Sequence, residues 1–435
     1  MAISPFEERY RTEMNAIFED DAKLKKWLAV EIALAKVHAK LGNIPPEAPK
    51  KIEFASRKVM PERVKEIEAQ IHHDLMAMVK ALTEQSGEAG KYVHLGATSY
   101  DIEDTATALI FLDAISLLEK RLLSLASVLK TLAREHKRTV CVGRTHGQHA
   151  VPTTYGMKFA LYYQELKRNL ERLSEAKKRI AVGKMSGAVG TMATFGKDGP
   201  KIQQMVMDEL GLDGDKITNQ VVQRDRHAEV ICALALVAAL LEKIAKEIRN
   251  LQRSEIGEIA EPFASKQVGS STMPQKRNPH KSERVCSLAR LVRANVPIAL
   301  ENISLEHERD LTNSANERAI FAESFVCVDY MILEMIKILS GLVFFEDNIK
   351  RNLELTQGLI MAERVMIYLV DRGMGRQEAH ELVRTLSHEA FAKKRHLKEL
   401  LLERKLLNRD EVQKLFDYST YVGHAEKIVE DAIKG

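Results

Sequence analysis

The chain has 435 residues, of which 45% are hydrophobic and 29% charged, and this composition excludes a mainly disordered protein. Its length exceeds the size of a single hydrophobic core, and an aromatic content of 6% favours helices over an all-β sandwich. The formal net charge of +4 excludes the sequence-wide cationic field of a nucleic-acid binder, although a local site for a small anion remains compatible with it.

The N-terminal residues and the cysteines predict a cytoplasmic protein. Residues 1–8 contain neither the basic nor the apolar segment of a secretory signal, and the most apolar stretch, 230–241, is too short to span a bilayer. No CxxC pair occurs, so we expect free thiols in a reducing compartment. The four cysteines are Cys141, Cys232, Cys286 and Cys327. We therefore expect neither a membrane nor a nucleic acid among the partners.

The first part of the chain is predicted to be helical. Residues 22–41 place Leu24, Trp27 and Leu28 on one apolar stripe, and Gly42 ends this helix. Prolines at 45, 46 and 49 indicate a short connector, and residues 61–85 predict one or two further helices. The polar segment 91–101 (KYVHLGATSYD) is predicted to be the first domain boundary.

Unusually long helices are predicted beyond this segment. Residues 102–136 contain no Gly or Pro and would extend about 52 Å as one helix. Four more long segments follow, at 155–182, 225–257, 281–305 (kinked at Pro297) and 314–342. Because residues 231–241 are apolar almost all round, we expect this helix to be enclosed by neighbours, including helices of other subunits.

The last part of the chain predicts shorter helices at 359–371, 377–395 and 409–416. The expected fold class is therefore all-α, with three helical domains. Their predicted bounds are 1–96, 97–345 and 346–435, and the central one is a long-helix bundle shared across a homotetramer.

The breaks between the long helices contain polar clusters that packing alone does not require. Residues 139–154 (TVCVGRTHGQHAVPTT) could be a capped loop between helices, or a metal site at His146 and His149. The metal interpretation is the weaker one, because no HExxH pattern occurs and structural zinc usually has cysteine ligands.

Two further breaks carry cations and hydroxyl groups. Residues 258–282 form a long connector suited to binding an anion, although a solvated basic loop would look the same. Residues 306–318 (EHERDLTNSANER) could equally be a capped turn. The sequence contains no P-loop and no GxGxxG, so neither nucleotide-phosphate motif accounts for these clusters.

Residues 269–279 (GSSTMPQKRNP) resemble the signature loop of the fumarase/aspartase superfamily. The KRNP form of the loop, together with Glu283, resembles the adenylosuccinate lyase family within it. Further matches follow in the family's order at 9–10, 73–74, 93–99 (VHLGATS), 144–149 (RTHGQH), 223–227 (QRDRH) and 309–318. The resemblance therefore covers the chain from one end to the other.

The resemblance implies a β-elimination that releases fumarate from adenylosuccinate to give AMP, and from the succinyl-carboxamide ribotide of purine synthesis. It also implies an all-α homotetramer whose active sites each combine three subunits, with no metal and no cofactor. Such an elimination needs a base, an acid and positive charge for the carbanion. Its substrates are small molecules, and its remaining partners are copies of the chain itself.

The resemblance gives five residues catalytic roles. His146 is the implied general acid, and Ser270 the implied general base. Ser271 carries the same hydroxyl group, and the resemblance rather than the sequence chemistry selects Ser270. Activation of a serine base requires positive potential, which Lys276 supplies. The remaining two are His73, which orients the substrate with Asp74, and Glu283, which lies near the acid and base.

The resemblance also implies two groups of binding residues. One group holds the substrate and its carboxylates, with Lys276 among the groups facing the carboxylates. The other holds the phosphate and nucleotide, consistent with the preference of arginine for oxyanions. The first group is His72, Asp74, His94, Thr98, Ser99, Gln220, Ser271 and Asn278; the second is Arg9, Tyr10, Arg309, Ser314 and Arg318.

Two rival interpretations remain open. Another fumarate-releasing lyase of the superfamily, such as argininosuccinate lyase or fumarase, would have the same fold. The predicted phosphate clamp at 309–318 argues against it, because those substrates carry no phosphate. A non-catalytic structural oligomer is the second rival, and the presence of His146, Ser270 and Lys276 argues against that.

Overall fold

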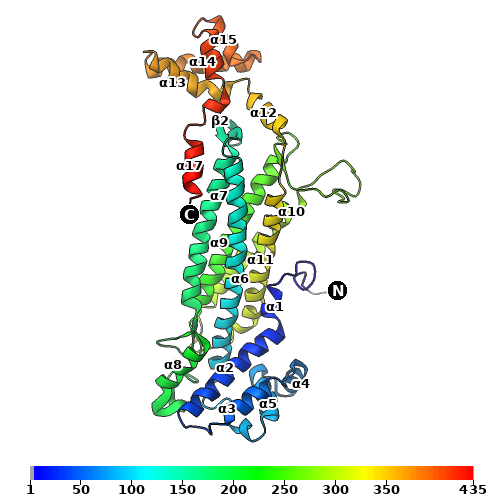
Figure 1. The fold of residues 1–435 in the computed structure, drawn as a ribbon, viewed down its shortest axis with the longest axis vertical. Helices are drawn as coiled ribbons and strands as arrows, with labels where there is room; N and C mark the ends of the chain where they lie inside the picture. The colour runs from blue at the N-terminus through cyan, green and yellow to red at the C-terminus, as the bar shows by residue number, and fades with distance from the viewer. Residues whose placement is uncertain (1–3, 435) are drawn as a thin grey trace. The chain divides into compact units, whose positions relative to one another are not determined.

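The long helices dominate the computed structural model, which describes residues 4–434 (Figure 1). Each of the five predicted long segments is confirmed as a single helix. Their bounds are α6 Ser99–Glu135, α7 Tyr155–Ile180, α9 Asp225–Leu251, α10 His280–Glu301 and α11 Ser314–Ser340. Helix α9 ends six residues earlier than predicted, because the chain turns before Gly257, whose φ of 56° is left-handed.

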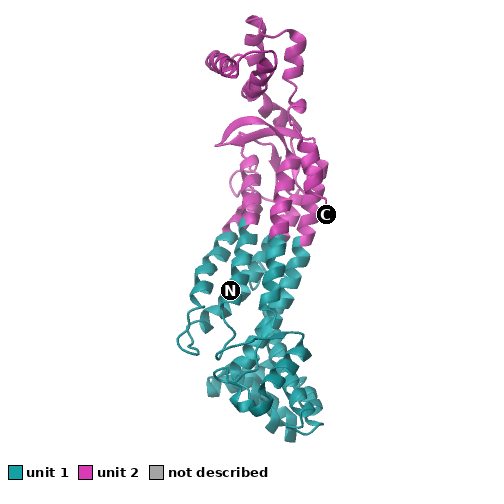
Figure 2. Ribbon diagram, turned by 90° about the vertical axis from the view of Figure 1, so that its left-hand side faces the viewer, with its two compact units in different colours: residues 1–122, 169–239, 288–332 teal, residues 123–168, 240–287, 333–435 magenta. Residues whose placement is uncertain are grey.

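The chain divides into two compact units, coloured separately in Figure 2. Unit 1 comprises residues 1–122, 169–239 and 288–332, and unit 2 comprises 123–168, 240–287 and 333–435. Each of the five long helices contributes residues to both units. The division into domains 1–96, 97–345 and 346–435 stays a prediction.

Unit 1 has a core built on its N-terminal helices. These are α1 Asn15–Phe18, α2 Asp20–Lys40, α3 Ala48–Ser56, α4 Pro61–Ile71 and α5 Asp74–Ser86. Unit 1 also contains η1 Gly87–Tyr92, η2 Ala193–Asp198 and α8 Gly199–Leu210. Trp27, Leu34, Met78 and Val206 are buried together in this core. The predicted connector at 45–49 ends early, because Pro49 occupies the first turn of α3, where proline costs no hydrogen bond. A short parallel pair joins β3 Val182–Gly183 to β4 Asp213–Gly214.

Unit 2 contains a β-hairpin where the sequence predicted a loop. Strands β1 (Val140–Thr145) and β2 (Gln148–Thr154) pair antiparallel, with Val140 opposite Thr154 and Thr145 opposite Gln148. The two turn residues, His146 and Gly147, have φ values of 54° and 74°. Two successive left-handed residues match the right-handed twist of a hairpin.

The rest of unit 2 is helical apart from one short antiparallel pair. Strand β5 (Ile259–Ala260) pairs with β6 (Val343–Phe344). The C-terminal elements are α12 Glu346–Glu354, η3 Leu359–Met361, α13 Ala362–Asp371, α14 Arg376–Lys393, α15 Leu397–Glu403, α16 Arg409–Leu415, η4 Tyr418–Thr420 and α17 Ala425–Ala432. Within residues 4–434, no helix combines the length and apolar character needed to cross a membrane.

Candidate active site

His73 and Ser99 meet at the start of two helices in unit 1. His73 precedes α5, and its Nδ1 accepts a hydrogen bond from the Met76 N–H at 3.4 Å. Its Nε2 lies 3.4 Å from the Ser99 hydroxyl, which begins α6. His72 ends α4 in a left-handed conformation with an exposed side chain. The structure thus brings together two of the predicted site residues, His73 and Ser99.

Asp74 and Arg318 form an ion pair in the same unit. The Arg318 Nη2 donates to the Asp74 Oδ2 at 2.6 Å. Burial favours a raised pKa for Asp74, but the hydrogen bond and the charge of Arg318 outweigh it, so the pKa is lowered. In the structure, this predicted phosphate ligand therefore already has a carboxylate partner.

Arg318 and Ser314 line one cavity of about 300 Å³. Tyr100 and Glu103 from α6 also line it. Burial, reinforced by the charge of Asp74, raises the pKa of Glu103 to about 8. A cavity that combines cations, aromatic rings and a carboxyl of raised pKa has the character of a ligand site.

Gln220 and Arg309 are joined directly. The Arg309 Nη1 donates to the Gln220 Oε1 at 2.8 Å, and the guanidinium lies 3.7 Å from the centre of the Tyr100 ring. The Arg309 Nε is buried and has no hydrogen-bond partner within residues 4–434. A buried, unpaired N–H of this kind is costly unless a ligand satisfies it.

His94 is held by a buried carboxylate. Its Nδ1 lies 2.6 Å from the Glu31 Oε1, and its backbone N–H donates to the Glu31 Oε2 at 3.0 Å. Burial disfavours the imidazolium, but the hydrogen bond and the charge of Glu31 outweigh it and raise the pKa of His94. His94 has a φ of 62°, so these two contacts hold it in an uncommon backbone conformation.

The two N-terminal site residues precede α1. Arg9 is exposed, and its guanidinium lies 6.0 Å from the centre of the Tyr10 ring. Tyr10 packs against Tyr330 with the ring centroids 5.0 Å apart. Arg9 thus presents its charge at the surface of unit 1, while Tyr10 is anchored to α11.

His146 stands at the tip of the unit 2 hairpin with an exposed side chain. The base of the hairpin is fixed by Glu258, which accepts hydrogen bonds from Arg144, the Tyr155 hydroxyl and Asn352 at 2.5 to 2.9 Å. Glu258 is fully buried, so its carboxylate ties strand β1 to the chain that follows α9. The hairpin therefore offers His146 to solvent on a rigid support.

Ser270 lies in the signature loop of unit 2. Its Oγ accepts hydrogen bonds from the backbone N–H groups of Thr272 at 3.3 Å and Met273 at 3.0 Å. Ser271 is exposed and makes no side-chain hydrogen bond within residues 4–434. Two N–H donors stabilise negative charge on an oxygen, so Ser270 is the better candidate for an alkoxide.

The same loop folds back on itself. A Cβ at Gly269 would lie 1.9 Å from the Lys276 carbonyl oxygen, and the Asn278 Nδ2 donates to the Gly269 carbonyl at 2.8 Å. At the loop's end, the buried Glu261 carboxylate accepts from the N–H groups of Lys281 and Ser282 at 3.1 and 3.0 Å, at the start of α10. Only glycine permits this close approach at 269.

Lys276, Asn278 and Glu283 line a second cavity of about 740 Å³ in unit 2. Lys246 and Arg249 of α9 and Arg253, which follows the helix, line it as well, so cations outnumber the single carboxylate. Such a cavity favours anions. Within residues 4–434, no group of three or more His, Cys, Asp and Glu side chains could hold a metal ion.

Comparisons with known proteins identify the family. A family model described as a lyase matches residues 8–294, and one described as the adenylosuccinate lyase C-terminus matches 358–432. The adenylosuccinate lyase of Pyrococcus abyssi is 56% identical, over 100% of this chain and 98% of that protein. That of Methanocaldococcus jannaschii is 51% identical over 100% of this chain and 96% of its own. The chain belongs to the adenylosuccinate lyase family.

Solved structures place this family member in the fumarate lyase fold. A fumarate lyase from Mesorhizobium sp. BNC1 matches with a TM-score of 0.90 and 33% identity, covering 97% of each chain. A 3-carboxy-cis,cis-muconate lactonizing enzyme from Pseudomonas putida also has a TM-score of 0.90 and 33% identity, covering 99% of this chain and 98% of its own. Enzymes with different names thus share the fold, so the substrate depends on the site.

Three carboxylates that support this family's motifs escaped the sequence analysis. Asp101 binds the segment that ends at Thr98, Glu31 holds His94, and Glu258 holds Arg144. Glu31 had a detectable signal, because it is a charged residue on the apolar stripe of its helix. Asp101 and Glu258 lie in polar segments, where one more carboxylate gives no signal.

Proposed function

We propose that the protein eliminates fumarate from adenylosuccinate to give AMP, and releases fumarate from the succinyl-carboxamide ribotide by the same reaction. The observation that carries the proposal is the geometry of Ser270, whose Oγ accepts two backbone N–H groups within the signature loop. The full-length similarity to adenylosuccinate lyases supports the choice of substrate.

Ser270 acts as the base in this proposal. Its alkoxide removes a proton from the methylene carbon of the succinyl group, beside a carboxylate. The N–H groups of Thr272 and Met273 lower the cost of the alkoxide, and Lys276 adds positive charge. Thr98, Ser99, Ser271 and Asn278 bind the carboxylates of the succinyl group.

His146 acts as the acid. As the carbanion's electron pair forms the double bond of fumarate, the bond between carbon and nitrogen breaks, and His146 donates a proton to the departing nitrogen. The exposed position of His146 at the hairpin tip leaves its ring free to reach a substrate. His73, with Asp74, orients the substrate near the acid, and Glu283 lies close to the reacting groups.

The nucleotide is held by cations of unit 1. Arg309 and Gln220, which contact each other, bind the nucleotide together with Ser314. Arg318 exchanges its Asp74 partner for the phosphate, since a phosphate offers the guanidinium a stronger oxyanion. Arg9 and Tyr10 complete the phosphate site, and His72 and His94 border the substrate.

Absorbance spectroscopy on purified protein tests the proposed reaction. Mixing with adenylosuccinate should produce AMP and fumarate at a catalytic rate. Argininosuccinate and malate serve as parallel substrates, because other members of the superfamily act on them. Turnover of either one, with adenylosuccinate left intact, would assign the protein to a different lyase.

The active form in this proposal is a cytoplasmic homotetramer whose sites each combine three subunits. Exposed Leu236, Leu291 and Leu300 on the long helices support burial against other copies of the chain. The four cysteines are all free thiols, which supports a reducing compartment. Light scattering during size exclusion should give four times the chain's 49.1 kDa, and an active monomer would contradict the assembly.

Subunit sharing has its own test. Inactive His146→Ala and Ser270→Ala tetramers, mixed after dissociation and reassembled, should recover part of the activity. Recovery is expected because some sites in a hybrid combine an intact His146 from one chain with an intact Ser270 from another. No recovery would place both residues of each site on the same chain.

A further inference from the structure

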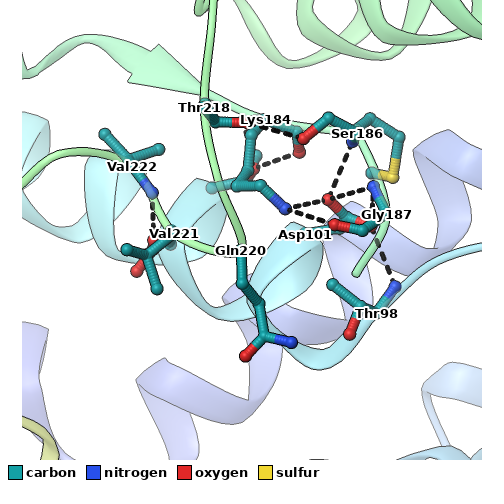
Figure 3. Close-up of polar contacts among 12 residues, drawn as sticks. Thr98, Asp101, Lys184, Ser186, Gly187, Thr218, Gln220, Val221 and Val222 are labelled. Atoms are coloured by element: carbon teal, nitrogen blue, oxygen red, sulfur yellow. Dashed lines mark hydrogen bonds and ion pairs between the residues drawn. The ribbon is translucent and has the colours of Figure 1, made fainter. Parts of the chain in front are cut away.

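A buried ion pair joins the first turn of α6 to the segment that follows α7 in unit 1 (Figure 3). The Lys184 Nζ donates to the Asp101 carboxylate, and both side chains are fully buried. The same carboxylate accepts from the backbone N–H groups of Ser186 at 2.9 Å and Gly187 at 3.1 Å. The carboxylate is thus satisfied by an ammonium group and by backbone donors from the segment after α7.

Asp101 also fixes the segment that leads into α6. Its Oδ2 accepts from the Thr98 N–H at 2.9 Å, and its own N–H donates to the Thr98 carbonyl at 3.0 Å. This reciprocal pair determines where Thr98 and the adjacent Ser99 lie at the start of the helix. Figure 3 shows Thr98 beside the Asp101 carboxylate, with Lys184 and Gly187 around it.

The network continues to the segment that carries Gln220. The Ser186 hydroxyl lies 2.7 Å from the Thr218 hydroxyl, two residues before Gln220. A Cβ at Gly190 would lie 2.0 Å from the Thr218 carbonyl oxygen, so the two segments are in close contact. Hydrogen bonds therefore link Asp101 to two segments that bind the substrate in the proposed function. One contains Thr98 and Ser99, and the other contains Gln220.

A buried charge pair is a costly way to hold a fold together. The desolvation of both ions often cancels their attraction, and apolar replacements can be as stable or more so. An acceptor for several converging backbone donors, however, fixes loop geometry in a way that an apolar residue does not. Because Asp101 is fully buried, it acts only through the residues that it holds.

We propose that Asp101, neutralised by Lys184, is a positioning residue that sets the places of Thr98, Ser99 and Gln220 for substrate binding. The inference rests on the proposed function, since those three residues are assigned to the substrate there. Substituting Asp101 should therefore alter KM more than kcat, because the residues it places bind the substrate and do not exchange protons with it.

The test is a double-mutant cycle with Asp101→Asn and Thr98→Ala, read as kcat/KM for adenylosuccinate. Asparagine keeps the shape but turns one acceptor oxygen into a donor that opposes the surrounding N–H groups. We expect kcat/KM to fall by about tenfold to a hundredfold, mainly through KM. The Thr98→Ala effect should shrink at least about threefold in the Asp101→Asn background, because Thr98 is already displaced there.

The matched control is Leu118→Ala, a cavity variant of a fully buried residue on the same helix α6. It should lower the unfolding midpoint while KM stays at the wild-type value. If Asp101→Asn does not fold, Asp101→Asn/Lys184→Met enters the cycle instead, because it leaves no charge in the buried pair. A second cycle, of Ser186→Ala with Gln220→Ala, tests the link to Gln220, because Ser186→Ala removes only the hydroxyl contact with Thr218.

The outcomes separate this inference from the function on which it rests. Suppose that the wild type turns over adenylosuccinate, but the effects of Asp101→Asn and Thr98→Ala on kcat/KM multiply independently, within about twofold. That result would overturn the positioning role alone. A KM change in Leu118→Ala equal to that in Asp101→Asn would also overturn it, because destabilisation would then explain both. Absence of wild-type turnover would overturn the proposed function and this inference with it.

Discussion

The network around Asp101 and the signature loop around Ser270 are held in opposite ways. Asp101 bonds to Lys184, Ser186 and Gly187, which lie 83 to 86 residues further along the chain. Ser270 bonds to residues two and three positions away, and the hydrogen bond from Asn278 to Gly269 in the same loop spans nine. The first geometry depends on the tertiary fold, whereas the second depends on one turn.

This contrast indicates how stability and activity are coupled in the two places. Residues of the Asp101 region are buried in the core of unit 1, so substitutions there should affect unfolding and binding together. The signature loop is largely exposed between Ala264 and Arg277, so substitutions there should change activity with little effect on unfolding.

Ser270→Ala should have the largest effect. Loss of a general base lowers kcat by about 10²–10⁴-fold, while adenylosuccinate should still bind. The unfolding midpoint should stay at its wild-type value, because the lost hydrogen bonds lie in an exposed turn. Steady-state kinetics, calorimetric titration and thermal unfolding measure the three quantities.

Ser271→Ala is the matched control for this variant. The Ser271 hydroxyl makes no hydrogen bond within residues 4–434, so it is available to bind a substrate carboxylate. Its loss should therefore weaken the binding of adenylosuccinate, while turnover remains measurable. Near-normal kcat in Ser270→Ala would rule out Ser270 as the base. If the two variants behaved in the reverse way, the base would be Ser271.

Arg224→Met should have the largest effect on stability. Arg224 is buried in unit 1, with its Nη1 2.9 Å from the Asp104 Oδ2 and its Nε 2.9 Å from the Glu317 Oε1. Removing one partner leaves two buried carboxylates uncompensated, which costs about 3–5 kcal/mol of unfolding free energy. Thermal unfolding should show a clearly lower midpoint.

Arg63→Met provides the comparison, because Arg63 pairs with Glu84 on the exposed surface of the same unit. Its midpoint should change little, since solvent screens exposed pairs. Equal midpoints for Arg224→Met and the wild type would show that this buried network adds nothing to stability.

Gly269→Ala should reduce activity without unfolding the protein. The new Cβ would lie 1.9 Å from the Lys276 carbonyl oxygen, so the loop has to open and Ser270 moves with it. Because misplaced catalytic groups lose up to about 10²-fold in rate, we expect kcat to fall by at least about tenfold. Gly375→Ala is the control, since its Cβ would meet nothing closer than 3.8 Å. Equal activity of both variants would contradict the tight turn.

The same contrast explains what the sequence could predict. Long helices such as α6 and α9 follow from their apolar pattern, and the signature loop from its motif. The hairpin was missed because its turn is His146–Gly147 rather than Asn-Gly or Asp-Gly, although β-branched residues flank it. Sequence motifs therefore predicted the signature loop of unit 2 better than they predicted the polar contacts of unit 1.

Contacts between distant residues could not be predicted in this way. Lys184 sits among small and apolar residues, and nothing in that segment points to Asp101. Glu31 lies 63 residues before His94. One sequence shows that a charged residue interrupts an apolar stripe, but the fold decides which partner it meets.

The pair of Glu31 and His94 gives the smallest predicted effect, a pH dependence of stability. Burial favours the neutral ring, but the hydrogen bond and charge of Glu31 raise the pKa of His94 above its usual 6.5 in the folded protein. The stabilisation from the charged pair is then fully present below about pH 6.5, the unfolded value, and is lost as the pH rises through the raised folded pKa. Unfolding midpoints measured from pH 5.5 to 8.5 should follow this direction.

Glu31→Gln should reverse the direction of this pH dependence, because it removes the negative charge beside His94 and leaves burial to dominate. The pKa of His94 should then fall below its usual value, so the variant gains stability as the pH rises towards and past 6.5. The difference in unfolding midpoint between the wild type and Glu31→Gln should be largest at acidic pH and should become smaller above neutrality. Glu84→Gln, an exposed carboxylate in the same unit, should show a constant difference over this range. If the Glu31→Gln difference were constant as well, His94 would be neutral in the folded protein, and a hydrogen bond without charge would hold this part of unit 1.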